Sequence, residues 1–394
     1  MNKKLIISRL DNRIWSGLFE EGQIVELYCS SPETSKIALD DIYVGRVKNI
    51  AHNIQVAFVE VADHVECYYN IGENPQPIFT NKIGKKPLCI GDELLVQVTK
   101  EALKTKTLTV SSKLSFKGKY ALLTVGDTRI GVSSKIDKTL REELQQIAKP
   151  FVTTEYGFII RTNAKEVDKS VVVAEIKQLI LEYEKLIKTA QTRTVFTCLK
   201  QGEKQYLTKL LDIYQNGQIE IVVEDVELYE EIKTFLEKHQ PEDVENLKLY
   251  QDKLLPLHKL YALEKEIEHA LREHVWLKSG AYLVIQPTEA LTVIDVNTGK
   301  CVSKKKDDET MLKINLEAAR EAARQIRLRN LSGIILIDFI NMDNENSMQT
   351  LLEFFQRELK KDAITTTLVD VTKLQLVEVT RKKVRKPLHE AVRE

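Results

Sequence analysis

Two aspartates interrupt two apolar stretches in the last third of the chain, and no other feature constrains the fold as strongly. The first stretch covers residues 290–297 and is rich in β-branched residues. Because side chains alternate between the two faces of a strand, Asp295 and Asn297 share one side. Leu291 and Val293 lie on that side too. The pattern predicts a strand with an acid and an amide on a common face.

The second stretch covers residues 333–340 and is apolar at nearly every position. An apolar run of this kind is typical of a strand buried between two helix layers of an α/β sheet. Asp338 lies in its C-terminal half. We therefore expect both aspartates toward the carboxyl ends of their strands, where open α/β sheets bind ligands.

Two buried carboxylates require a compensating cation, because an unpaired buried charge costs several kcal/mol or more. Oxygen ligands without an accompanying His or Cys cluster suit Mg²⁺ or Mn²⁺ better than zinc. The alternative is structural, with each aspartate pairing with an arginine or capping a helix. Two strand-end acids with an asparagine two residues from one of them favour the metal site.

A helix of about twenty residues is predicted between the two strands, from the capping residues 307–310 to a point before Gly333. Its apolar residues recur at the spacing of a buried stripe. A basic stripe beside it either binds phosphates or pairs with Glu317 and Glu321 on the same helix. The apolar stripe is Leu312, Leu316, Ala319, Ala323 and Ile326, and the basic stripe is Arg320, Arg324 and Arg327.

Three segments of the sequence read LTVIDVNTGK from residue 291, INLEAAREAARQIRLRNLSGIILIDFINM from residue 314 and LVEVTRKKVRKPL from residue 376. Together they resemble the catalytic region of the ribonuclease E/G family. The resemblance runs through the last third in order and extends more weakly over the rest. It implies metal ligands at Asp295 and Asp338, with Asn297 as their helper.

The chain departs from this family pattern at three places. Asn341 stands where relatives usually have the second aspartate of DFIDM. Residues 362–365 replace an arginine-bearing segment, and Leu374-Gln375 replaces a Phe-Gly pair. These departures concern the reaction rate and the RNA contacts more than the metal site.

Composition places the chain among ordinary soluble proteins, long enough at 394 residues for two to four domains. Lys+Arg and Asp+Glu balance at 58 each, so nucleic acid would bind to a local patch rather than through global charge. Five cysteines without CxxC spacing predict reduced thiols and no intrachain zinc site. The resemblance implies a Cys-Pro-x-Cys zinc link after the basic segment, which this sequence lacks, so we expect any homodimer to form without a zinc link. No apolar run approaches a membrane span, and we expect a cytoplasmic protein.

The resemblance implies a multidomain α/β (α+β) chain. A split RNase H-like domain carries an inserted OB-fold barrel and a 5′-sensor domain, and a DNase I-like α/β catalytic domain follows. The predicted boundaries are 1–38 and 193–270 for the RNase H-like parts, 39–114 for the OB-fold, 115–192 for the sensor and 271–394 for the catalytic domain. Short segments near 195–198 and 219–223 are assigned to the second RNase H-like part.

Residues 41–112 contain five short strands separated by turns, which predicts a small barrel. The resemblance identifies it as an RNA-binding OB-fold, in which a sheet face stacks bases. The alternative is that half of its aromatic residues form the core and the basic residues solvate an edge. The stacking candidates are Tyr43, Phe58, Tyr68 and Tyr69, and the phosphate-binding candidates are Arg46, Lys48, Lys104 and Lys106.

A strand ending at Arg161-Thr162 resembles the family's pocket for a 5′-monophosphate. An arginine fork and a threonine hydroxyl both form charge-assisted hydrogen bonds to phosphate. The resemblance makes Gly131-Val132 the loop whose backbone N–H completes the pocket. The adjoining residues 133–135 are less basic than in relatives.

Residues 380–386 form the densest basic cluster, which includes Arg381, Lys382 and Arg385. The resemblance makes this a helix that contacts RNA beside the metal site, and the alternative is a disordered tail. The leading hypothesis is a Mg²⁺-dependent endoribonuclease acting on single-stranded RNA in processing or decay. The alternatives are a catalytically weak RNA-binding or scaffold protein that retains the fold, and a metal-dependent phosphoesterase for another substrate.

Overall fold

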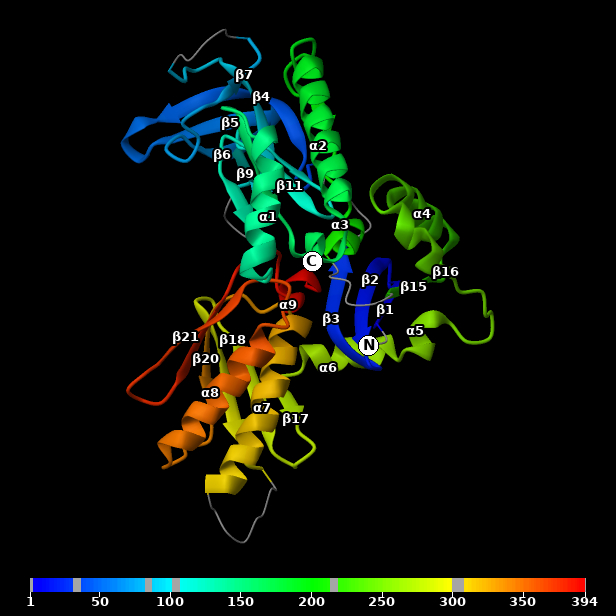
Figure 1. Cartoon of the computed structure of the whole chain (residues 1–394), viewed down its shortest axis with the longest axis vertical. Helices are drawn as coiled ribbons and strands as arrows, with labels where there is room; N and C mark the ends of the chain where they lie inside the picture. The colour runs from blue at the N-terminus through cyan, green and yellow to red at the C-terminus, as the bar shows by residue number, and fades with distance from the viewer. Residues whose placement is uncertain are drawn as a thin grey trace. The chain divides into compact units, whose positions relative to one another are not determined.

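A computed structural model describes residues 3–30, 37–81, 87–100, 107–212, 219–299 and 308–393 (Figure 1). The chain divides into two compact units. The first combines Met1–Pro32 with Gln215–Glu394, and the second is Glu33–Tyr214. In the described residues, no helix is both long enough and apolar enough to cross a membrane.

A five-stranded sheet in the first unit joins the start of the chain to a segment two hundred residues later. Its order is β16-β15-β1-β2-β3, in which β1 pairs with β2 antiparallel and with β15 parallel. Leu5, Ile6 and Ile7 of β1 are fully buried, so this central strand is covered on both faces. The strands are β1 (Lys3–Leu10), β2 (Arg13–Glu20), β3 (Gln23–Ser30), β15 (Ile219–Val223) and β16 (Leu247–Leu249).

A six-stranded sheet in the same unit carries both aspartates. Its order is β17-β18-β19-β20-β22-β21, and its one parallel pair in the described residues is β19–β20. The predicted helix between these two strands is confirmed as α7. The elements are β17 (His274–Trp276), β18 (Tyr282–Pro287), β19 (Leu291–Asn297), α7 (Asp308–Leu328), β20 (Gly333–Asp338), α8 (Glu345–Leu359), β21 (Thr366–Val371) and β22 (Val377–Arg381).

Helices α7 and α8 pack against each other and share one core with this sheet (Figure 1). Ile335 and Ile337 of β20 point into that core and are fully buried. Ile334, on the other side, is 51% exposed, and Asp338 is exposed. The expectation that β20 is buried on both faces is therefore wrong. The side bearing Asp338, called the open face below, has no helix over it in the described chain.

The second unit contains the predicted five-stranded barrel. Strand β8 pairs with both β9 and β4, which closes the ring β4-β5-β6-β9-β8. Cys198–Lys200 (β14) adds to β4, so this segment belongs to the barrel sheet and not to the RNase H-like part to which we assigned it. The strands are β4 (Ile42–Ala51), β5 (Val56–Ala62), β6 (Val65–Asn70), β7 (Ile78–Phe79), β8 (Glu93–Lys100) and β9 (Thr109–Ser111).

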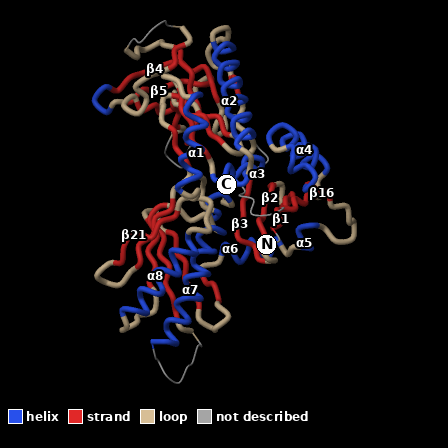
Figure 2. The backbone as a smooth tube through the Cα atoms, in the orientation of Figure 1, coloured by secondary structure: helices blue, strands red, loops and turns tan. Residues whose placement is uncertain are grey.

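A four-stranded sheet, β10-β11-β13-β12, follows the barrel and shares a hydrophobic core with it. Helix α2 packs along β10, β11 and β14. Figure 2 shows it as a long helix beside the strands of this unit. Glu175 of α2 accepts the N–H groups of Lys119, Tyr120 and Ala121, each at 2.7 Å. The elements are β10 (Ser115–Lys117), β11 (Ala121–Val125), β12 (Ile130–Val132), α1 (Lys138–Ala148), β13 (Tyr156–Ile160) and α2 (Lys169–Ala190).

The remaining helices are short connections, apart from α4, which covers the first sheet's parallel strands. They are α3 (Gln205–Asp212), α4 (Val226–His239), α5 (Leu257–Leu260), α6 (Leu263–Leu271) and α9 (Leu388–Ala391). Single 3-10 turns occupy His52–Ile54, Lys149–Phe151, Thr162–Glu166 and Pro241–Asn246.

Candidate active site

Asp295 and Asp338 are register partners on the parallel strands β19 and β20. Adjacent strands lie about 4.8 Å apart, and register partners point to the same side. The alternate residues Ile294 and Ile337 are buried in the core, so both carboxylates lie on the open face. The predicted sharing of one face by Asp295 and Asn297 matches this alternation.

The two carboxylates repel each other. Partial burial, together with the negative charge of Asp295, raises the pKa of the Asp338 carboxyl above its ordinary value. No basic side chain forms an ion pair with either aspartate among the residues that the structure describes. The structural alternative, in which each acid pairs with an arginine, therefore does not account for this arrangement.

Asn297 is bonded to one member of the pair. Its Nδ2 donates to Oδ2 of Asp295 at 2.6 Å, which fixes the orientation of that carboxylate and leaves the amide oxygen of Asn297 available. Two carboxylates and an amide oxygen on a solvent-facing surface fit Mg²⁺, which uses few protein ligands and keeps several waters. The donor set thus suits the predicted metal.

Asn315 holds the end of β20 and was missed in the sequence. Its side chain is fully buried in α7; Nδ2 donates to the carbonyl of Ile340 at 2.7 Å, and Oδ1 accepts the N–H of the same residue at 3.0 Å. Ile340 lies two residues after Asp338, so this clamp fixes the strand end. The available signal was a polar residue within an otherwise apolar helix stripe.

A group of possible metal ligands in the barrel does not form a second centre. Glu60, Asp63 and His64 bring their ligand atoms within 4.8 Å of one another. Glu60 already pairs with Lys48 at 3.2 Å and accepts the N–H of His64 at 3.3 Å. We regard the group as an ordinary surface turn.

The basic stripe of α7 is largely engaged inside the fold. Arg324 pairs with Glu321 at 2.6 Å and donates to the carbonyl of Ile24 at 2.7 Å. Arg327 is buried and pairs with Glu26 at 3.0 Å. The prediction of RNA contact is therefore wrong for Arg327. Arg324 is half-buried and paired with Glu321 as in the self-pairing alternative, and its contact with RNA stays a prediction.

Arg320 is the exposed member of that stripe. Its guanidinium lies over the ring of Phe354 on α8, 5.2 Å from the centroid. Because α7 and α8 cover the sheet face opposite the carboxylates, Arg320 lies on the helix side of the domain. The basic stripe therefore does not adjoin the two aspartates, and RNA contact by Arg320 stays a prediction.

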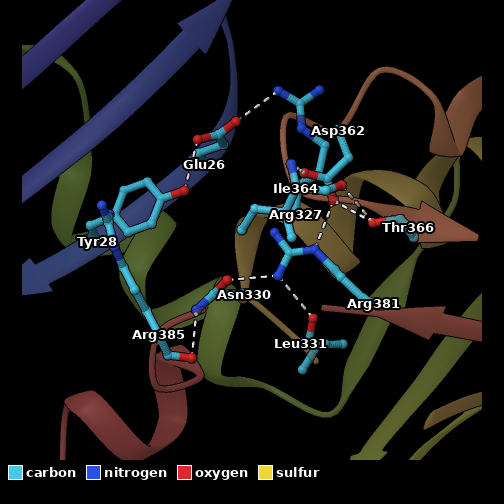
Figure 3. A network of polar contacts seen from close by, with 10 residues as sticks. All are labelled: Glu26, Tyr28, Arg327, Asn330, Leu331, Asp362, Ile364, Thr366, Arg381 and Arg385. Carbon is cyan, nitrogen blue, oxygen red and sulfur yellow. Dashed lines mark hydrogen bonds and ion pairs between the residues drawn. The ribbon is translucent and has the colours of Figure 1, made fainter. Parts of the chain in front are cut away.

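Arg381 anchors a buried network and is not a surface residue (Figure 3). It is 3% exposed; its Nε donates to Asp362 at 2.7 Å, and its Nη1 donates to Asn330 and to the carbonyl of Leu331. The predicted contact between Arg381 and RNA is therefore wrong. Asp362, one of the departures from the family pattern, is the residue that neutralises it.

The basic segment after Arg381 is not the expected helix. It leaves β22 as irregular chain, and α9 begins only at Leu388. Arg381 is the register partner of Gly333, at the opposite end of β20 from Asp338, so the segment starts about 16 Å away along the strand. Lys382 is exposed and Arg385 lies over Tyr28, and RNA contact by these two stays a prediction.

The barrel divides its aromatic candidates between core and surface. Tyr43 and Tyr69 are buried, with their hydroxyls bonded to Asp41 and Ser112 respectively, so stacking by these two is wrong. Phe58 and Tyr68 are half-buried register partners on one face. Stacking on this pair stays a prediction.

The barrel's basic candidates are paired or undescribed. Arg46 pairs with Glu93 at 3.1 Å, and Lys48 pairs with Glu60. Both side chains are therefore held by acidic partners on neighbouring strands. Lys104 and Lys106 lie outside the described residues.

One hydroxyl of the predicted 5′-phosphate pocket has a polar neighbour at the end of β13. The hydroxyls of Thr162 and Ser133 are 2.7 Å apart. Arg161 donates from Nη1 to the carbonyl of Gly118 at 2.7 Å and is half-buried. Gly131-Val132 is strand β12, paired with β13, rather than the expected loop.

Comparison with known proteins gives a consistent result. The sequence model of the Ribonuclease E/G family matches residues 115–384. Ribonuclease G of Salmonella typhimurium (strain SL1344) is 32% identical over 98% of this chain and 81% of its own length. Ribonuclease G of Escherichia coli (strain K12) is 30% identical over the same shares, and Ribonuclease E of Synechocystis sp. is 31% identical over 99% of this chain and 58% of its own length.

Proposed function

The chain belongs to the ribonuclease E/G family, and on this premise we propose that it is an endoribonuclease that cuts single-stranded RNA with Mg²⁺ at Asp295 and Asp338. The observation that carries the proposal is the register pairing of these two aspartates on the open face. The mutual repulsion of these neighbours, which have no basic partner in the described residues, favours a bound cation, and the relatives are named as ribonucleases.

Asp295 and Asp338 would hold the ion, and Asn297 would keep Asp295 aimed through its 2.6 Å hydrogen bond. A bound Mg²⁺ supplies an acidified water and neutralises charge on the phosphodiester oxygens. Asn315 keeps Asp338 in register by clamping the backbone at Ile340. Mn²⁺ has similar ligand preferences and would substitute for Mg²⁺.

RNA contacts are proposed for exposed and half-buried residues in both units. Phe58 and Tyr68 offer adjacent half-exposed rings on the barrel, a surface suited to stacking bases. Lys382, Arg385 and Arg320 offer charge for the phosphate backbone. The substrate is a cellular transcript undergoing processing or decay.

A 5′-monophosphate pocket is proposed at Arg161, Thr162 and Ser133. The adjacent hydroxyls of Thr162 and Ser133 could both donate to a terminal phosphate, and the Arg161 guanidinium lies at the same strand end. Ser133 thus provides a polar group where the sequence is less basic than in relatives.

The domain assignments are also proposals. The sheet order β3-β2-β1-β15-β16, with three antiparallel strands followed by two parallel ones, supports a split RNase H-like domain. The closed barrel supports an OB-fold, and the sheet carrying the aspartates supports a DNase I-like catalytic domain.

A second function is a catalytically weak RNA-binding or scaffold protein. Asn341 favours it, because an amide stands three residues after Asp338 in place of the carboxylate usual in relatives. A neutral side chain there removes one negative group from the edge of the site.

Cleavage of a short 5′-labelled single-stranded RNA distinguishes the proposed endoribonuclease from an RNA-binding scaffold protein and from another phosphoesterase. We expect discrete products with Mg²⁺ and none in EDTA, with RNA binding retained in EDTA. Binding without products under both conditions would support the scaffold function. Hydrolysis of a small phosphodiester without RNA cleavage would indicate a different phosphoesterase.

A further inference from the structure

Three aromatic rings gather on the open face beside the aspartates. His274 and Trp276 lie on β17 and Tyr282 lies on β18; the ring centroids of His274 and Trp276 are 5.7 Å and 5.0 Å from that of Tyr282. Trp276 is 63% exposed. Its neighbour Leu277 is buried, so the alternation of the strand turns Trp276 away from the core.

Strand register places these rings next to the carboxylates. Tyr282 is the partner of Asn297, and Val284 is the partner of Asp295. Tyr282 and Asp295 are therefore diagonal neighbours on one face, about 7–8 Å apart at their backbones. A row of side chains thus runs from Trp276 through Tyr282 to Asp295 and Asp338.

The charge around the site favours an uncharged contact at this place. Asp295 and Asp338 repel a phosphodiester until a cation lies between them. The nearby basic stripe of α7 is on the opposite side of the sheet, and Arg381 is buried. An aromatic face attracts a base whatever the charge of the backbone, because every base has a stacking surface.

We propose that Trp276 and Tyr282 stack one base of single-stranded RNA next to the phosphodiester that is cut. This inference rests on the proposed function and assigns positioning residues to it. The stacked base belongs to a nucleotide immediately beside the scissile phosphate, because one nucleotide spans the gap between Tyr282 and the carboxylates. Stacking strength makes the site favour a purine there.

Intrinsic fluorescence tests the contact without cleavage. The chain has two tryptophans, and Trp15 is 4% exposed, so a change on RNA binding reports Trp276. In the Asp338→Asn variant with EDTA, we expect single-stranded RNA to quench the emission. The double variant Asp338→Asn, Trp276→Phe should bind the same RNA without quenching. Binding of RNA by Asp338→Asn with unchanged emission would overturn the proposal.

Cleavage of RNA that lacks one base tests the position of the contact. Trp276→Ala should cut intact RNA about tenfold more slowly than wild type at limiting substrate, as expected for one lost base stack. A series of RNAs, each with an abasic nucleotide at a different position, should show slower cleavage by wild type at one position only. Trp276→Ala should cut that abasic RNA no more slowly than it cuts intact RNA. Leu254→Ala, which truncates a side chain that is 95% exposed, is the matched control and should cut normally.

The outcomes distinguish this inference from the proposed function. Quenching without cleavage by wild type would retain the stacking contact and reject the nuclease. Cleavage by Trp276→Ala at the wild-type rate, or an equal loss on every abasic RNA, would reject the stacking contact and retain the nuclease. A dimer that Trp276→Ala dissociates would show that a second copy covers the rings, which also overturns the proposal.

Discussion

At Asp338, the charge of a neighbouring aspartate and partial burial act in the same direction. Both disfavour the ionised carboxyl, so its pKa in the folded protein lies above the ordinary value. The folded state therefore loses stability as the pH rises through the interval between the unfolded and folded pKa values. At neutral pH the apo protein carries an unfavourable pair of charges that a divalent cation would relieve.

Asp338→Asn should melt at a higher temperature than wild type in EDTA at neutral pH, because the substitution removes this repulsion. The advantage should vanish at acidic pH, below the pKa values of both states, where the wild-type carboxyl is also neutral. Mg²⁺ should raise the melting temperature of wild type and leave the variant unchanged. Thermal melts across pH provide the measurement.

Glu289→Gln, which neutralises an exposed carboxylate in the turn between β18 and β19, is the matched control and should behave as wild type. A lower melting temperature of Asp338→Asn in EDTA would contradict this account. It would show that the carboxylate has a stabilising partner in the folded protein.

The side of an element on which a residue lies was predictable from the sequence where it depends only on the alternation of side chains within that element. The alternation of β19 placed Asp295 and Asn297 together without any knowledge of the neighbouring strands. Arg327 was not predictable, because helical periodicity gives the face of α7 but not the element that packs over it. That element is β3, which brings Glu26 from three hundred residues earlier in the chain.

The end of strand β22 and the segment after it contain two adjacent basic residues that point in opposite directions. Arg381 points inward to Asp362 and Asn330, and Lys382 is exposed. The alternation of the strand thus places one basic side chain inside the fold and the next at the surface, where RNA contact stays a prediction.

Arg381→Met should lower the free energy of unfolding by about 3–5 kcal/mol, because it leaves the buried carboxylate of Asp362 without its partner. Lys382→Ala should unfold as wild type does and bind RNA more weakly, with a salt dependence reduced by about one phosphate contact. Denaturant unfolding and RNA titration at several salt concentrations measure the two effects. Normal stability of Arg381→Met would argue against the network.

The open face of the sheet was not predictable from the apolar run of β20. Such a run signals burial, yet Ile334 and Leu336 lie on the uncovered side beside Asp338. The cause is the placement of α7 and α8 on a single face of the sheet, which the sequence of β20 alone does not reveal. By contrast, the helix between the aspartates and the five strands of the barrel followed from periodicity and turn signals alone.

At the scale of the whole molecule, the proposed 5′-phosphate pocket and the proposed metal site belong to different units. Arg161 and Thr162 belong to the second unit, and the two aspartates belong to the first. A terminal phosphate bound in one unit would increase the residence of the same RNA in the other, in the manner of linked binding sites.

RNA with a 5′-monophosphate should therefore be cut faster than RNA of the same sequence with a 5′-hydroxyl. Thr162→Val should abolish the difference without changing the rate on 5′-hydroxyl RNA, because only the phosphate contact is lost. Initial rates on paired substrates are the measurement. Equal rates with wild type would reject the 5′-phosphate pocket.

The assignment of the whole chain as a nuclease depends on the carboxylate pair. Single-turnover cleavage by wild type, Asp295→Asn and Asp338→Asn, with thermal melts of the same samples, tests it directly. Each variant should remain folded and bind RNA, and cleavage should fall on the order of 10³-fold or more, because the ion that acidifies the attacking water is no longer held. A variant that melts normally and cuts RNA at the wild-type rate would remove the two aspartates from the mechanism.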